Sequence, residues 1–61
     1  MPEARERFLK LYANLPLPLR KDIVLVLDEG PITWDVAYLE VDNKTKKADL
    51  ILHKLTELNI I

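Results

Sequence analysis

The absence of cysteine is the feature that most constrains how this 61-residue chain can fold. A domain of this length buries only about 60 % of the surface that its unfolded form exposes, so such domains often depend on disulfides, metals or oligomerisation. Without cysteine there is no disulfide framework and no thiolate metal site, and the single histidine shows no zinc-ligand spacing. The core must therefore come from aliphatic packing, for which the hydrophobic content is 49 %. We expect a single domain over residues 1–61 that gains stability from dimerisation.

The first amphipathic segment covers residues 3–14. Pro2 precedes it, where a missing N–H costs nothing, and the LPLPL stretch ends it because residues before proline disfavour the helical region. We expect an N-terminal helix whose apolar stripe either covers the chain's own core or forms a two-fold dimer interface. The stripe follows the i, i+3, i+4, i+7 spacing of one helix face and consists of Phe8, Leu11, Tyr12 and Leu15.

Residues 23–27, IVLVL, are compatible with two structures. Their β-branched side chains favour a buried strand. Pro18 is suited to a first helical residue and Gly30 to a helix stop, which favours a helix instead. Periodicity does not decide a run this short, so helix and strand both stay open here. The helical interpretation relies on the spacing of Leu19, Ile23, Val26 and Leu27.

The segment from residue 30 to residue 41, GPITWDVAYLEV, is expected to form a turn at 30–32 and then a short helix. Thr33 is a good N-cap, and Asp35 complements the helix dipole in the first turn. A hairpin strand is the alternative, although neither face of an alternating pattern would be uniformly apolar. The apolar side of the helix would consist of Trp34, Ala37, Tyr38 and Val41.

The last segment gives the clearest helical pattern. Thr45 is suited to cap its first turn, and Asn59 to take the left-handed position after its end. Asp42 and Asn43 tolerate the left-handed conformation, so we expect them to form the preceding turn. The apolar stripe consists of Ala48, Ile51, Leu52, Leu55 and Leu58.

Residues 18–61 resemble the helix-turn-helix core of archaeal and bacterial winged-helix regulators. The resemblance is carried by GPIT at 30–33, by Ala37 and Val41 in the short helix, and by a longer helix that ends in NII at 59–61. It implies an all-α fold: an N-terminal helix plus a three-helix helix-turn-helix core, winged-helix-like with the wing absent. A small α+β fold with a strand or hairpin at 22–40 is the alternative. The resemblance also implies a dimeric transcriptional regulator.

In such regulators the second helix of the motif lies in the major groove. Lysines at its start would meet phosphates, which position a protein without reading sequence, and the helix N-terminus itself favours phosphate oxygens. The structural alternative is that this lysine-rich stretch is only a solvated helix start. The residues expected to contact duplex DNA are Asn43, Lys44, Thr45, Lys46, Lys47, His53 and Lys54.

The charge distribution supports a second hypothesis, a non-enzymatic protein–protein interaction module. Residues 1–21 carry +3, residues 22–42 carry −6 and residues 43–61 carry +2, and the pI is about 5.7. A low pI is unusual for a domain held mainly by phosphate attraction. Such a module would present an apolar groove, or the acidic segment with Asp35 and Glu40, to a larger assembly.

Other functional classes find little support in the sequence. No nucleophile or glycine-rich loop accompanies His53, and the neighbouring carboxylates are expected to be solvent-facing charges, so we expect no enzyme, no cofactor and no metal. Trp34 and Tyr38 are more typical of core packing than of a binding platform. No apolar stretch resembles a signal peptide or a membrane span, which predicts a cytoplasmic protein. Abundant Lys, Glu, Ile and Leu are typical of thermophiles.

Overall fold

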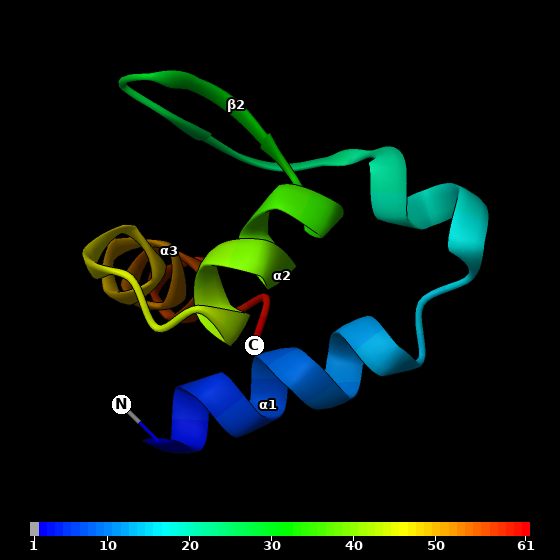
Figure 1. Ribbon diagram of the computed structural model, residues 1–61, viewed down its shortest axis with the longest axis horizontal. Coiled ribbons are helices and arrows are strands. Elements are labelled where there is room, and N and C mark those ends of the chain that lie inside the picture. The colour runs from blue at the N-terminus through cyan, green and yellow to red at the C-terminus, as the bar shows by residue number, and fades with distance from the viewer. Residues whose placement is uncertain (1) are drawn as a thin grey trace.

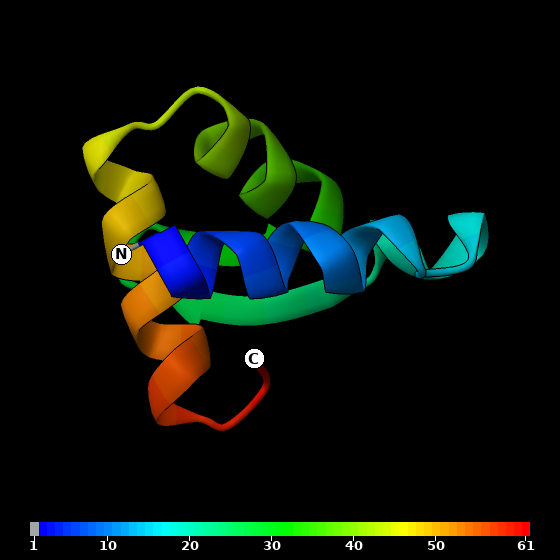
Figure 2. The ribbon, with the colours of Figure 1, turned by 90° about the horizontal axis from the view of Figure 1, so that it is seen from below.

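The computed structural model describes residues 2–61, and it contains three α-helices, one 3-10 helix and one β-hairpin in the order α1, η1, β1, β2, α2, α3. In Figure 1 the hairpin, α2 and α1 follow one another from top to bottom, and Figure 2 shows α3 standing crosswise to α1 at one end of the molecule. The elements are α1 Pro2–Ala13, η1 Leu17–Lys21, β1 Ile23–Leu27, β2 Gly30–Thr33, α2 Trp34–Asp42 and α3 Lys46–Glu57.

The predicted all-α fold is wrong, because the segment expected to be the first helix of the core forms a hairpin. The α+β alternative, with a hairpin within residues 22–40, describes the chain instead. The helix that Pro18 was expected to start extends only over the short η1, and the backbone becomes extended at Asp22. The β-branched residues of β1 then outweigh the helical spacing, because their side chains fit an extended, half-buried strand better than a helix.

The turn predicted at residues 30–32 is also wrong, since the turn of the hairpin lies at residues 28–29 and Gly30 already begins β2. Gly30 has a φ of +130°, a conformation that glycine adopts without strain. The two strands pair antiparallel, with Leu25 opposite Ile32 and both side chains buried. The hairpin therefore covers the core with one face only.

The core consists of aliphatic side chains and one aromatic side chain, Phe8, which is fully buried. Every α-helix and both strands contribute to it, and no polar or charged residue is buried among residues 3–61. Trp34 and Tyr38 pack against this cluster from its margin, in agreement with the core-packing interpretation. The buried residues are Ala4, Phe8, Leu25, Ile32, Ala37, Val41, Ala48, Ile51, Leu52 and Leu55.

The end of α3 follows the prediction. Asn59 has a φ of +57°, the left-handed conformation expected of it. The chain then folds back, and the Ile60 N–H donates to the Leu55 carbonyl at 2.9 Å. Ile61 packs against the core as a result.

Candidate nucleic-acid interface

The helix pair α2–α3, with the turn at residues 43–45 between them, is held by side-chain caps at the start of both helices. Thr33 Oγ accepts a hydrogen bond from the Val36 N–H at 3.2 Å, and Thr45 Oγ accepts one from the Ala48 N–H at 3.1 Å. Both threonines were predicted as N-caps, and both predictions are confirmed. Each cap satisfies one backbone donor that the helix itself leaves without a partner.

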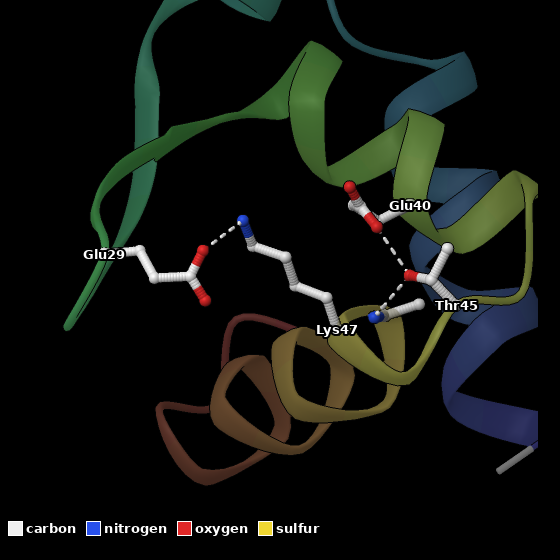
Figure 3. A network of polar contacts seen from close by, with 5 residues as sticks. Glu29, Glu40, Thr45 and Lys47 are labelled. Carbon is white, nitrogen blue, oxygen red and sulfur yellow. Dashed lines mark hydrogen bonds and ion pairs between the residues drawn. The ribbon is translucent and has the colours of Figure 1, made fainter.

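Thr45 also connects the two helices directly. Its hydroxyl donates to Glu40 Oε1 at 2.5 Å while the same oxygen accepts from Ala48 (Figure 3). One side chain therefore fixes the start of α3 and its position against α2. Because both capacities of the hydroxyl are engaged, we place Thr45 in the framework of the interface and not on its contact surface.

The turn itself differs from the prediction in one residue. Asp42 is the last residue of α2, and Asn43 has a right-handed φ of −85°. The left-handed position falls on Lys44, whose φ is +54°. The Thr45 N–H reaches back to the Glu40 carbonyl at 3.3 Å, and this contact closes the turn one residue later than expected.

Three of the predicted DNA-contacting residues are exposed at the start of α3: Asn43, Lys44 and Lys46. Helix geometry leaves the first N–H groups of α3 without intrahelical partners, so this end also carries a partial positive charge. The structure thus brings two free ammonium groups, an amide and a helix N-terminus together on one exposed corner.

Lys47 is positioned differently from its neighbours. Its Nζ lies 3.0 Å from Glu29 Oε2 in the turn of the hairpin, and its side chain is 28 % exposed (Figure 3). The ion pair joins residues 18 positions apart, which the sequence alone did not indicate. The charge of Lys47 is therefore largely neutralised by a carboxylate of the same chain.

His53 and Lys54 lie more than one turn further along α3, and both are exposed. His53 Nε2 lies 3.7 Å from Glu57 Oε1, and Lys54 Nζ lies 3.9 Å from Glu57 Oε2. A carboxylate thus accompanies the predicted basic residues in this half of the helix. Lys47 and Lys54 thus both lie beside carboxylates, and Asp49 stands in the first turn of α3 together with Lys46.

Arg5 of α1 also lies beside the basic corner, a position that its sequence pattern does not indicate. A cavity of about 380 Å³ lies between α1 and the α2–α3 turn, and both Arg5 and Lys44 line it. Glu6 and Asp49 line the same cavity, so it carries both signs of charge. Arg5 of the basic N-terminal segment and Lys44 before α3 nevertheless line the same cavity of one molecule, so no dimer is needed to bring them together.

The predicted dimer stripe on α1 faces the chain's own core. Phe8 is fully buried and Tyr12 packs against the core cluster, while Leu11 and Leu15 are partly buried. Of the two roles that the sequence left open for this stripe, covering the core is the one observed for Phe8 and Tyr12.

Tyr12 also takes part in a polar network that sequence reasoning missed. Its hydroxyl donates to Asp35 Oδ1 at 2.5 Å, its ring stacks on that of Tyr38 with centroids 4.3 Å apart, and the guanidinium of Arg20 lies 4.4 Å from the centre of the Tyr12 ring. The hydrogen bond to Asp35 raises the pKa of Tyr12, because ionising the phenol would remove the donor and face a carboxylate. These contacts join α1, η1 and α2.

The acidic residues chosen for a protein-binding surface are partly engaged inside the molecule. Asp35 accepts the Tyr12 hydrogen bond, and Glu40 accepts that of Thr45. Within the described residues 2–61, no three metal-ligating side chains come together, and no helix is long and apolar enough to cross a membrane.

The chain matches no known protein family, no curated protein and no solved structure.

Proposed function

We propose that the chain binds duplex DNA through the corner formed by the α2–α3 turn and the start of α3. The observation that carries this proposal is the fixed helix pair, whose three-residue turn and Thr45 cap hold Lys44 and Lys46 exposed beside a helix N-terminus. Anionic groups are favoured at such a terminus, and exposed lysines contact phosphate oxygens. Arg5, across the neighbouring cavity from α1, extends the same basic corner.

The proposal assigns different weights to the seven residues expected from the sequence. Lys44 and Lys46 contact phosphates, and Asn43 donates its amide to phosphate or base edges. Thr45 and Lys47 hold the framework through Glu40 and Glu29. His53 and Lys54 lie beside Glu57 and contribute less.

The test is a titration of labelled random-sequence duplex DNA with the purified protein at about 50 mM and about 200 mM salt, since each neutralised phosphate adds to the salt dependence of binding. Lys44→Glu with Lys46→Glu is expected to abolish binding. Lys47→Glu is avoided, because it would place a second carboxylate beside Glu29 and disturb the hairpin.

The matched control is Lys10→Glu with Lys21→Glu, which changes the net charge by the same amount on α1 and η1. This variant is expected to bind like the wild type. Equal loss of DNA affinity in both variants would show that binding depends only on net charge. Full binding by the α3 variant would contradict the proposed site.

The second candidate function is a protein–protein interaction module, favoured by a run of exposed aliphatic residues along η1 and β1. Scattered exposed leucines are ordinary, but a contiguous apolar surface indicates a partner. Charge reversal at Asp35 or Glu40 would disturb internal contacts, so an exposed aliphatic residue is the better variant for this surface. The residues are Leu17, Leu19, Ile23 and Val26, with exposed fractions of 71, 44, 59 and 71 %.

A further inference from the structure

The outer edge of β1 is one of the two unpaired edges of the hairpin. The sheet has two strands, and within residues 2–61 no third strand pairs with β1. All five of its residues are apolar, so it lacks the charges, prolines and glycines that natural edge strands use against further pairing. A register shift between Ile23 and Leu25 leaves the regular part of this edge around Val26.

Pro31 determines which backbone groups point away from the hairpin. It lies directly opposite Val26 in the antiparallel ladder. Opposed residues in such a ladder either exchange two N–H···O bonds or direct those groups outward, and proline has no N–H to exchange. The pair is therefore of the second kind, and the N–H and C=O of Val26 point to the outer edge of β1.

The same geometry makes the two edges of the hairpin unequal. Pro31 directs its ring nitrogen to the outer edge of β2, which thereby lacks a donor in the middle of the strand. The β1 edge offers both a donor and an acceptor at Val26. A further strand can pair with β1 in a regular antiparallel manner. At the outer edge of β2 the missing N–H of Pro31 prevents such pairing.

The space beside β1 is an open groove of about 230 Å³ between the hairpin and α3. An extended strand along this edge would cover exposed apolar side chains on both sides, Val26 of β1 and Leu50 of α3, which are 71 % and 45 % exposed. The groove is lined by Val26, Leu27, Asp28, Glu29, Leu50 and Lys54.

We propose that β1 of a second copy of the chain occupies this edge, antiparallel to the first, about a two-fold axis at Val26. The N–H of Val26 in each protomer donates to the Val26 carbonyl of its partner, and the two hairpins form one four-stranded sheet. An edge that carries both a donor and an acceptor is complementary to itself under a two-fold axis. Because β2 is blocked by Pro31, the assembly closes at two chains.

Two further observations favour a second copy over an unrelated peptide. An isolated two-stranded hairpin is only marginally stable, and a 61-residue chain buries a small fraction of its surface on its own. Surface buried against a partner therefore adds stability to both. Antiparallel pairing also brings the segment before β1 of one protomer, where Arg20, Lys21 and Asp22 give a net charge of +1, toward the acidic turn with Asp28 and Glu29 of the other. Charge complementarity thus accompanies the backbone pairing. The interface does not include Lys44 or Lys46, so its test is independent of the test of the proposed DNA contact.

The interface is small by the standards of permanent dimers. A standard interface buries about 800 Å² per partner, roughly a fifth of the 4291 Å² exposed by this chain. Two five-residue strands bury less than this. We therefore expect a reversible dimer whose population rises with protein concentration.

Sedimentation velocity on the purified full chain tests the proposal, over a concentration range from about 1 μM to about 1 mM that covers weak association by mass action. The wild type is expected to shift from the 7.1 kDa monomer toward twice that mass. Val26→Lys is expected to remain monomeric throughout. Leu39→Lys, which adds the same charge at a 57 % exposed position on α2, is the matched control and should dimerise like the wild type.

Val26→Pro is the second variant, because it removes the N–H that points away from β2 and removes no N–H of the hairpin ladder. Circular dichroism checks that each variant is folded. Exchange of the Val26 amide hydrogen in the wild type should slow as protein concentration rises. A wild type that stays monomeric, variants that dimerise normally, or growth beyond the dimer would each overturn the proposal.

Discussion

Tyr12 illustrates how a single side chain can be both core and polar connector. Its ring packs against the core cluster, and its hydroxyl donates to Asp35 on α2. Arg20 lies over the same ring and also donates to the Tyr12 carbonyl at 3.3 Å, which attaches η1 to α1. The residue was predicted only as part of an apolar stripe, because a helical spacing shows which face is buried but not which hydroxyl finds an acceptor.

The raised pKa of Tyr12 predicts a loss of stability in alkali. The folded chain holds the phenolic proton more tightly than the unfolded chain, so its contribution is complete below the ordinary pKa of 10.0 and is lost as the pH rises through the folded value. Urea denaturation of wild type and Tyr12→Phe measures this. The wild type should be the more stable at pH 7, and the difference should shrink above about pH 10. A difference that is independent of pH would contradict the assigned hydrogen bond.

At the scale of elements, the two N-caps determine where α2 and α3 begin. Thr33 makes one side-chain hydrogen bond at the start of α2, whereas Thr45 makes two, one within α3 and one to Glu40 of α2. The two sites therefore form a natural comparison between a local cap and a cap that also joins two helices.

Thr45→Ala is expected to lower the free energy of unfolding by about 1–2 kcal/mol, and Thr33→Ala by about 1 kcal/mol, because both lose a cap and only the first loses a contact between helices. Chemical denaturation followed by circular dichroism gives both values. Thr45→Ser retains the hydroxyl and serves as the control, with a smaller loss than Thr45→Ala. Equal losses at positions 33 and 45 would show that the Glu40 contact adds nothing.

The sequence predicted those elements whose signals are local. The spacing of apolar residues located all three α-helices, and Thr33, Thr45 and Asn59 fixed ends where one residue type suits one conformation. The IVLVL run satisfied two periodicities at once, so the choice between helix and hairpin depended on packing partners that spacing does not reveal. The Lys47–Glu29 ion pair was missed for a related reason, since only the hairpin brings these residues together.

At the scale of the whole molecule, one small core supports the three α-helices and both strands among residues 2–61. Phe8 is its largest fully buried side chain by volume, and it contacts the aromatic ring of Trp34 with centroids 6.0 Å apart. A chain of this size has a total stability of only about 3–9 kcal/mol at the usual value per residue. A single large cavity therefore removes most of the margin.

Phe8→Ala is expected to cost about 3–5 kcal/mol and to lower the melting temperature strongly, because the core has no second aromatic that is fully buried to compensate. Leu17→Ala, at a 71 % exposed position, should change stability by less than about 0.5 kcal/mol. Thermal melts followed by circular dichroism distinguish the two. A cooperative transition of Phe8→Ala near that of the wild type would show that the core is distributed more widely than the burial indicates.

Because Glu29 forms an ion pair with Lys47, the hairpin turn competes with any polyanion for this lysine of α3. Glu29 is held 3.0 Å from the ammonium group by the fold, so its effective concentration far exceeds that of a phosphate free in solution. A phosphate that reaches Lys47 competes with this carboxylate for the ammonium group. Salt weakens both the internal ion pair and a contact between lysine and phosphate. At low ionic strength the internal pair is strongest, so it lowers the non-specific attraction of polyanions to Lys47.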